Sequence, residues 1–141
     1  MSPLLSLSVA VTFVWLGMVL AISFLEAPLK FRVAEVTIRI GLAIGRRVFR
    51  ALNVIELILA ATLALAISID APTTGIATCA AAAILVLLAQ VVVVRPVLTR
   101  RSDRVLGGED APRSVAHYWY VALEGVKVVA LVTTGTLILA S

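Results

Sequence analysis

The stretch that decides the fold runs from Arg113 to Thr133 and reads RSVAHYWYVALEGVKVVALVT. It is long and apolar enough for a membrane-spanning helix, since about 20 residues are needed to cross the hydrocarbon core of a bilayer. It nevertheless contains His117, Glu124 and Lys127. Ionisable side chains are expensive inside a bilayer, so this helix must supply them with partners or use them in a function.

The composition of the whole chain points to the same surroundings. Of 141 residues, 62% are hydrophobic and 14% are charged, whereas soluble domains are typically about 45–50% apolar and about 25% charged. The mean hydropathy is +1.12. A soluble fold could not bury this much apolar surface, so we expect an integral membrane protein. Cys79 is the only cysteine, which excludes a disulfide within the chain.

Four apolar segments predict an all-α fold, a bundle of four transmembrane helices forming a single domain over residues 1–141. We expect helices at about 4–26, 46–69, 74–95 and 114–139, with basic loops at about 27–45 and 96–113. Pro28 and Pro96 are expected to end the first and third helices, because proline interrupts the helical hydrogen-bond ladder. The first loop should turn into the second helix from about Gly41 onward. Trp15, near the middle of the first helix, is expected to pack inside the bundle.

The basic residues predict the orientation. Eleven of the twelve Lys and Arg residues lie in or beside the two loops, and Lys127 is the twelfth. The positive-inside rule places both loops in the cytoplasm and both termini on the other side. We therefore expect a multi-pass protein of the plasma membrane whose basic residues serve topology and bind no nucleic acid. Tyr118 and Trp119 are expected to anchor the fourth helix at the membrane interface.

The two halves of the chain correspond at an offset of 68 residues. This offset aligns Pro28 with Pro96. It also aligns Glu56 of the second helix with Glu124 of the fourth. Two helical hairpins of the same topology would form parallel repeats about an axis along the membrane normal. The alternative is a coincidence of similar helix and loop lengths.

Two helices each carry a polar stripe, in which four residues are spaced by three, four and three positions. The stripes are Arg46, Phe49, Asn53 and Glu56 in the second helix and His117, Tyr120, Glu124 and Lys127 in the fourth. This spacing puts each set on one helix face. The two glutamates should lie roughly 12–14 Å into a core about 30 Å thick, near the midplane. We expect the two helices to face each other, with Lys127 or His117 within reach of a glutamate.

The candidate site for a substrate or ion is built from the polar residues of these stripes. Its members are Asn53, Glu56, His117, Tyr120, Glu124 and Lys127. Two carboxylates accompany one ammonium group, which leaves one negative charge to be balanced by His117 or by a bound proton. Glu56 is favoured as the proton carrier, because Lys127 is one turn from Glu124 on the same helix. A purely structural ion-pair network and a docking surface for another subunit are the other interpretations.

Other chemistry lacks the residues that it needs. One histidine cannot supply two axial haem ligands, and no His or Cys cluster has metal-ligand spacing. The Gly41-x-x-x-Gly45 motif is read as a helix-packing motif. We expect no cofactor, no metal and no catalytic residue, so an enzyme acting on quinones or lipids is the least favoured function.

Several short motifs are shared with a known family. They are Trp15-Leu16-Gly17, Pro28-Leu29-x-Phe31, Arg47-Val48-Phe49-x-x-Leu52-Asn53, Arg95-Pro96 and His117. Through them, over most of its length, the chain resembles a family of small four-helix membrane proteins of unknown function, whose best-known animal member is associated with cisplatin resistance. The resemblance implies a fold rather than an activity, and Glu124 and Lys127 lie outside its pattern. The anthrone-oxygenase-like and DoxX-like four-helix families look similar in architecture and are the competing assignment.

Two functional classes follow from these observations. The first is a proton- or ion-coupled carrier, acting as a homo-oligomer because a four-helix bundle has little interior room. The second is a non-catalytic accessory subunit of a larger membrane complex, whose polar stripe is structural or binds a partner. A discrete homo-oligomer in native conditions would favour the carrier, and a stable hetero-complex would favour the subunit.

Overall fold

A computed structural model describes residues 1–70, 73–109 and 115–141 of the chain, and no strand occurs among them. The helical segments are α1 (Pro3–Val19), η1 (Leu20–Glu26), α2 (Ala27–Lys30), α3 (Ile38–Ile69), α4 (Thr74–Ala89), η2 (Gln90–Val94), α5 (Arg95–Leu106) and α6 (Val115–Ala140). Because several segments continue one another, they form the long helices Pro3–Lys30, Ile38–Ile69, Thr74–Leu106 and Val115–Ala140. Each is long and apolar enough to cross a membrane, as a multi-pass membrane protein requires.

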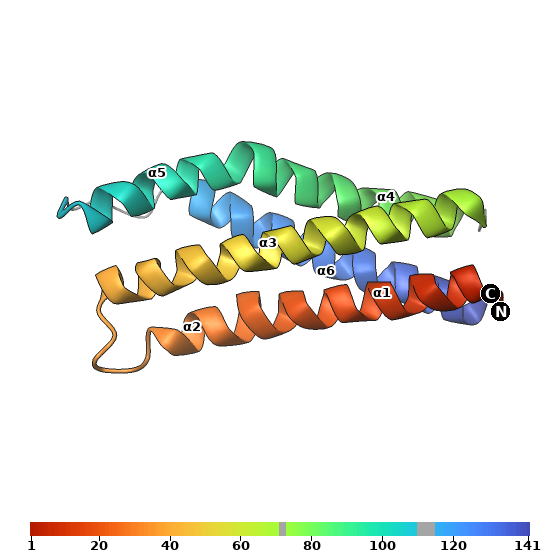
Figure 1. Cartoon of the computed structure of the whole chain (residues 1–141), viewed down its shortest axis with the longest axis horizontal. Coiled ribbons are helices and arrows are strands. Elements are labelled where there is room, and N and C mark those ends of the chain that lie inside the picture. The colour runs from red at the N-terminus through yellow and green to blue at the C-terminus, as the bar shows by residue number, and fades with distance from the viewer. Residues whose placement is uncertain (71–72, 110–114) are drawn as a thin grey trace.

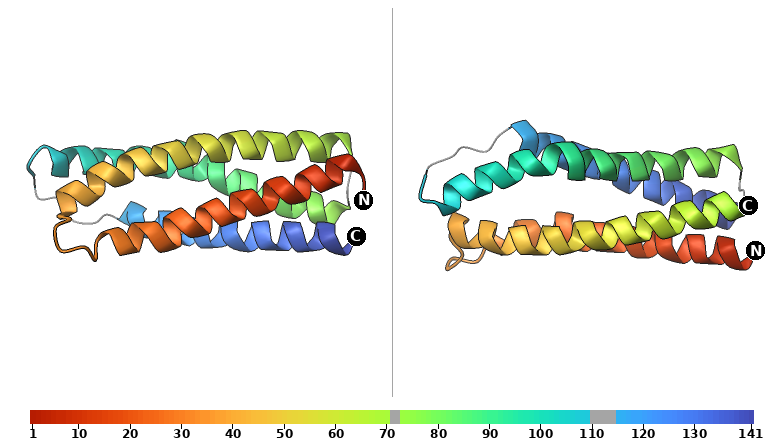
Figure 2. Two further views of the ribbon diagram at one scale, coloured as in Figure 1. Left: turned by 60° about the horizontal axis from the view of Figure 1, so that its bottom comes forward. Right: turned by 45° about the horizontal axis from the view of Figure 1, so that its top comes forward.

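The four long helices run alternately up and down one axis, and both termini lie at the same end (Figure 1). Around the bundle, α1 packs against α3 and α6, and α4 packs against α6 and α3. Figure 2 shows this arrangement from two further sides. It follows that α3 and α6, the helices that carry the two polar stripes, stand at opposite corners of the bundle.

The apolar core fills the half of the bundle nearer the termini. It includes Val11, Trp15, Leu16, Val19, Ala60, Leu63, Ala80, Ala83, Leu87, Ala130 and Leu131. Trp15 is fully buried, which confirms its predicted place inside the bundle. Large apolar side chains such as Leu65, Val92 and Val129 cover the outside instead. A surface of this kind suits contact with lipid rather than water.

The basic loops are shorter than the sequence suggested. The second long helix begins at Ile38 rather than near residue 46, and the third continues to Leu106 rather than ending near residue 95. Thr37 caps α3 by accepting a hydrogen bond from the Ile40 amide at 3.1 Å. A helix of this length spans about 48 Å, more than the roughly 30 Å of a hydrocarbon core. The arginine-rich ends are therefore helical extensions, which suits the good helix propensity of arginine.

The two prolines do not end their helices, contrary to the expectation from sequence. Each follows a widened, π-helical turn: the Ala27 amide bonds to the Ile22 carbonyl, and the Arg95 amide bonds to the Gln90 carbonyl. A proline ring clashes with the carbonyl four residues earlier, and a turn bonded over five residues relieves that clash. The same widened turn thus precedes Pro28 and Pro96 in the two halves, at the offset that the sequence shows.

Gly41 and Gly45 face the end of α2 and the residue that follows it. A Cβ atom at Gly41 would overlap the ring of Phe31, and one at Gly45 would lie 3.4 Å from Lys30 Nζ. Among the described contacts, the partner of this glycine motif is therefore the last residue of α2 and the residue that follows it. The close approach brings the basic end of α2 against α3.

Gly135 offers a direct test of the packing between α1 and α6. A Cβ atom there would lie 2.6 Å from Phe13 Cζ, whereas at Gly125 of the same helix it would meet nothing within 4 Å. We expect Gly135→Ala to displace the Phe13 ring and to lower the free energy of unfolding by about 1 kcal/mol or more. Gly125→Ala should be neutral or stabilising by up to about 1 kcal/mol. Unfolding in mixed micelles measures both, and equal stabilities would contradict this packing.

Candidate functional site

A fully buried lysine lies at the centre of the bundle. Lys127 Nζ is 2.6 Å from Glu56 Oε1 and 2.6 Å from Glu124 Oε1. It also donates to Gln90 Oε1 at 2.8 Å. The four side chains are at most 2% exposed. This geometry confirms the expectation that α3 and α6 present their stripes to each other, although they do so across the diagonal of the bundle.

The two carboxylates are satisfied on both oxygen atoms. Glu56 accepts from Trp15 Nε1 on Oε1 at 3.0 Å and from Asn53 Nδ2 on Oε2 at 3.0 Å. Glu124 accepts from the Ser23 hydroxyl on Oε2 at 2.5 Å. Such bonds replace the hydration that polar groups lose on burial.

Arg95 supplies a second positive charge to this region. Its Nε donates to Asn53 Oδ1 at 3.3 Å, and Asn53 in turn bonds to Glu56. The guanidinium carbon lies 5.3 Å from the ring centroid of Phe49 and 4.7 Å from that of Tyr120. Two carboxylates and two cations now balance. The unmatched charge inferred from the sequence arose because Arg95 was assigned to the boundary of a basic loop.

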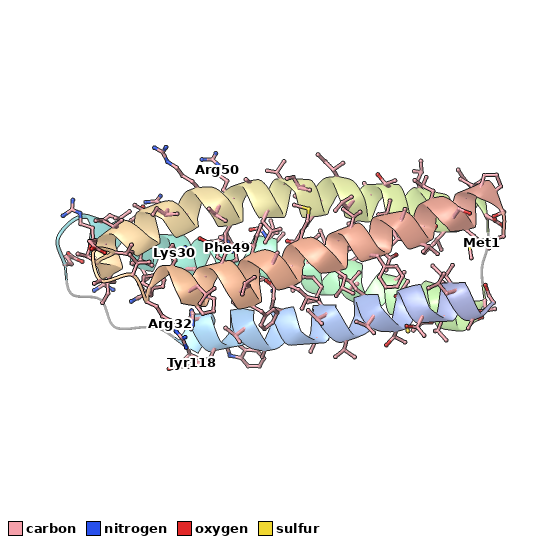
Figure 3. The ribbon with its side chains drawn as sticks, turned by 90° about the horizontal axis from the view of Figure 1, so that it is seen from below. Met1, Lys30, Arg32, Phe49, Arg50 and Tyr118 are labelled. Carbon is pink, nitrogen blue, oxygen red and sulfur yellow. The ribbon has the colours of Figure 1, made fainter. Side chains whose placement is uncertain are left out.

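A cavity of about 430 Å³ lies beside the network, on the side of the basic end. Its walls come from η1, α2, α3, α5 and α6 and from Phe31 in the turn after α2. Glu124, Tyr120 and Ser23 line it where it meets the network, and Lys30, Arg46 and Arg101 line it toward the basic end. Figure 3 shows the labelled Lys30, Arg32, Phe49 and Arg50 in the half of the bundle remote from Met1.

The predicted site residues fall into two adjoining groups. Asn53, Glu56 and Lys127 belong to the closed network, and His117 and Tyr120 line the cavity. Glu124 belongs to both groups. Glu56 was preferred as the proton carrier because Lys127 was expected to lie nearer to Glu124. That reason is wrong, because Lys127 lies equally close to the two glutamates. Glu124, not Glu56, is the carboxylate that the cavity reaches.

Sequence reasoning missed four members of the site. Ser23, Gln90 and Arg95 were not expected there, and Trp15 was expected to pack but not to donate a hydrogen bond. Three of them, Ser23, Gln90 and Arg95, lie within or directly after the widened turns that precede the prolines, and the prolines are the only mark of these turns in the sequence. Such π-helical turns occur frequently at functional sites.

The fold and the site together define a class of protein: a bundle of four membrane-length helices with a buried ion-pair network and an open cavity beside it. Comparisons with known protein families, with characterised proteins and with solved structures find no match to this chain. The resemblance to a family of small four-helix membrane proteins therefore remains a prediction.

Removal of the central ammonium tests whether the network holds the bundle together. We expect Lys127→Met to destabilise the protein by about 3–5 kcal/mol, since it leaves two buried carboxylates facing each other. Adding Glu56→Gln to that variant should restore part of the loss. Arg104→Met is the control, because Arg104 pairs with Glu109 at 2.9 Å with both side chains exposed, and its effect should stay within about 0.5 kcal/mol. Unfolding titrations with sodium dodecyl sulfate give all four stabilities, and equal effects of the two methionine substitutions would refute this role.

Proposed function

We propose that the protein is a small integral membrane carrier. In this proposal a solute enters the cavity from the basic, cytoplasmic end of the bundle, and its passage is coupled to a proton or ion at the buried network. The observation that carries the proposal is the place of Glu124. Among the described residues it is the one carboxylate that lines the cavity, and it is also bonded to Lys127.

The double role of Glu124 supplies a physical route for coupling. Its Oε1 contacts Lys127, which also contacts Glu56, and its Oε2 accepts from Ser23 at the cavity wall. A solute or proton that changes the charge of Glu124 must change how Lys127 is shared between the two glutamates. Coupling needs this kind of differential interaction, because a ligand shifts an equilibrium only as far as it distinguishes two states.

The size of the cavity supports binding by a single protomer. Its volume of about 430 Å³ falls within the roughly 300–1,000 Å³ typical of pockets for small organic molecules. A second protomer is thus not needed to create the binding space, which was the reason for expecting a homo-oligomer. We still propose that the protein forms a homo-oligomer in the plasma membrane, but the pocket does not require more than one protomer.

The orientation in the membrane is part of the proposal and has its own test. Ser2→Cys and Ala140→Cys, in a Cys79→Ala background, should react with an impermeant maleimide added outside intact cells. Glu109→Cys should react only after permeabilisation, because the positive-inside rule places the basic end in the cytoplasm. Glu109 is preferable to Gly108, whose φ of 94° favours glycine. Labelling of position 109 in intact cells would show that the orientation is the opposite of the one proposed.

The coupling is tested in vesicles loaded with a pH-sensitive dye. Small organic anions and cations are added outside one at a time, with the membrane potential clamped by valinomycin and potassium. We expect at least one solute to drive proton movement, and Glu124→Gln to reduce that rate at least tenfold, since the variant cannot exchange a proton there. Glu35→Gln, the same change at an exposed turn residue, should leave the rate unchanged.

A proton flux that does not depend on Glu124 would contradict the proposal. If every solute-driven proton flux survives Glu124→Gln, the carboxylate between cavity and network is not the coupling group. The carrier proposal would then be wrong, and the non-catalytic subunit expected as the alternative from sequence would replace it.

A further inference from the structure

Polar atoms without partners are concentrated around the cavity. Among the described residues, the buried side-chain atoms that lack a hydrogen bond are Glu26 Oε2, Arg95 Nη2, Ser102 Oγ and the Tyr120 hydroxyl. The last three belong to residues that line the cavity. Buried polar groups are normally satisfied, and each exception needs an explanation. A ligand in the cavity would provide one.

From this arrangement we propose that the cavity binds an amphipathic organic anion, which carries a carboxylate or phosphate head on an apolar body. The inference rests on the proposed function in using the same cavity, and it names the chemical class of the solute. The head accepts hydrogen bonds from Arg95 Nη2 and the Tyr120 hydroxyl, beside the network. The body extends along the aromatic wall toward the basic end.

The free donors identify the head. Arg95 is held by Asn53 through Nε and lies against the rings of Phe49 and Tyr120, so its unused Nη2 has a fixed direction. A guanidinium N–H can only donate, and a tyrosine hydroxyl donates readily to an oxyanion. Hydrogen bonds between ionised groups are about twice as strong as neutral ones. A carboxylate or phosphate is therefore the complement of these atoms.

The charges around the cavity also select against a cation. Lys30, Arg46, Arg95 and Arg101 line it, against one carboxylate among the described lining residues, Glu124. Both oxygen atoms of Glu124 already accept hydrogen bonds, from Lys127 and Ser23. Lys30 lies 3.5 Å from Glu26, and Arg46 lies 2.8 Å from Asp103. Of the described residues that line the cavity, four carry a positive charge and one a negative charge, and a cleft lined mainly by one sign of charge attracts the opposite sign.

The apolar wall identifies the body. Phe24, Phe31 and Phe49 line the cavity together with Leu42 and Leu98. A small inorganic anion would leave these surfaces in contact with water, whereas an alkyl or aromatic body would cover them. Ser102 lies two turns beyond Arg95 on α5, roughly 10 Å nearer the basic end. Its free hydroxyl can bind a second polar group of the ligand or the water at the entrance.

The proposal is tested by equilibrium binding to the full chain in nanodiscs of phosphatidylcholine, with empty nanodiscs as the blank. The probes are octanoate, octyl phosphate, octanol, octylammonium and inorganic phosphate, measured by calorimetry. We expect the two amphipathic anions to bind at least tenfold more tightly than the other three, because only they offer both the head and the body. Octanol or octylammonium binding as tightly as octanoate would overturn the proposal, and so would inorganic phosphate matching octyl phosphate.

Variants assign the contacts to named atoms. Arg95→Gln should weaken octanoate binding at least tenfold, and Tyr120→Phe, which keeps the ring against Arg95, should weaken it severalfold. Arg100→Gln is the matched control on the same helix, because Arg100 is exposed and does not line the cavity. If Arg95→Gln fails to fold, Tyr120→Phe decides. Unchanged affinity in the folded variants would overturn the assignment of the head.

A change of lipid composition tells a lipid head group from a free solute as the source of the anion. Replacing part of the phosphatidylcholine by phosphatidic acid should weaken octanoate binding if the natural ligand is a lipid head group, and should leave it unchanged if the ligand is a free solute.

Binding is measured without a gradient, so the binding result does not depend on coupling. Anion binding that needs Arg95, together with proton flux that ignores Glu124, would refute the carrier and keep the anion site. Flux that needs Glu124 but is driven by cations alone would do the reverse.

Discussion

A fully buried lysine ammonium group is the constraint on which this structure depends. Lys127 is fully buried, and Glu56 and Glu124 lie 2.6 Å from its Nζ. Between helices in a bilayer there is no hydrophobic driving force, because lipid tails are as apolar as leucine. Apolar packing alone therefore selects helix neighbours weakly. A charge that must meet its counter-charges selects them strongly, and meeting Glu56 across the diagonal fixes the rotation of both α3 and α6.

The segments that precede the two prolines contribute further side chains to the network around Lys127. Pro28 and Pro96 each follow a widened turn, and one polar side chain from each turn reaches the network. Gln90 thereby bonds to Lys127, and Ser23 bonds to Glu124. In the described part of the chain, all four long helices contribute to one polar network, since Trp15 joins it from the first. The cavity lies where this network meets the basic half of the bundle.

The elements of the fold that could be predicted are those that depend on one helix at a time. The number of long apolar helices, the stripe from Asn53 to Glu56 and the burial of Trp15 follow from composition and helical spacing. The roles of Gln90 and Arg95 could not be predicted this way, because they depend on how far one helix is rotated against another. The helix ends were misjudged for a related reason: proline was read as a terminator, but a membrane helix can absorb it in a widened turn.

The position of Arg95 links the contents of the cavity to the charge balance of the network. Arg95 reaches Glu56 only through Asn53, by a 3.3 Å bond to Oδ1, so its hold on the network is weaker than that of Lys127. An anionic head that engages Arg95 draws this positive charge toward the cavity. If the proposed anion binds in this way, Lys127 would be left to balance two carboxylates, and a proton or cation arriving at Glu124, the carboxylate that the cavity reaches, would restore the balance. An anion and a positive charge would in this way enter together, because the low-dielectric centre does not tolerate an unmatched charge.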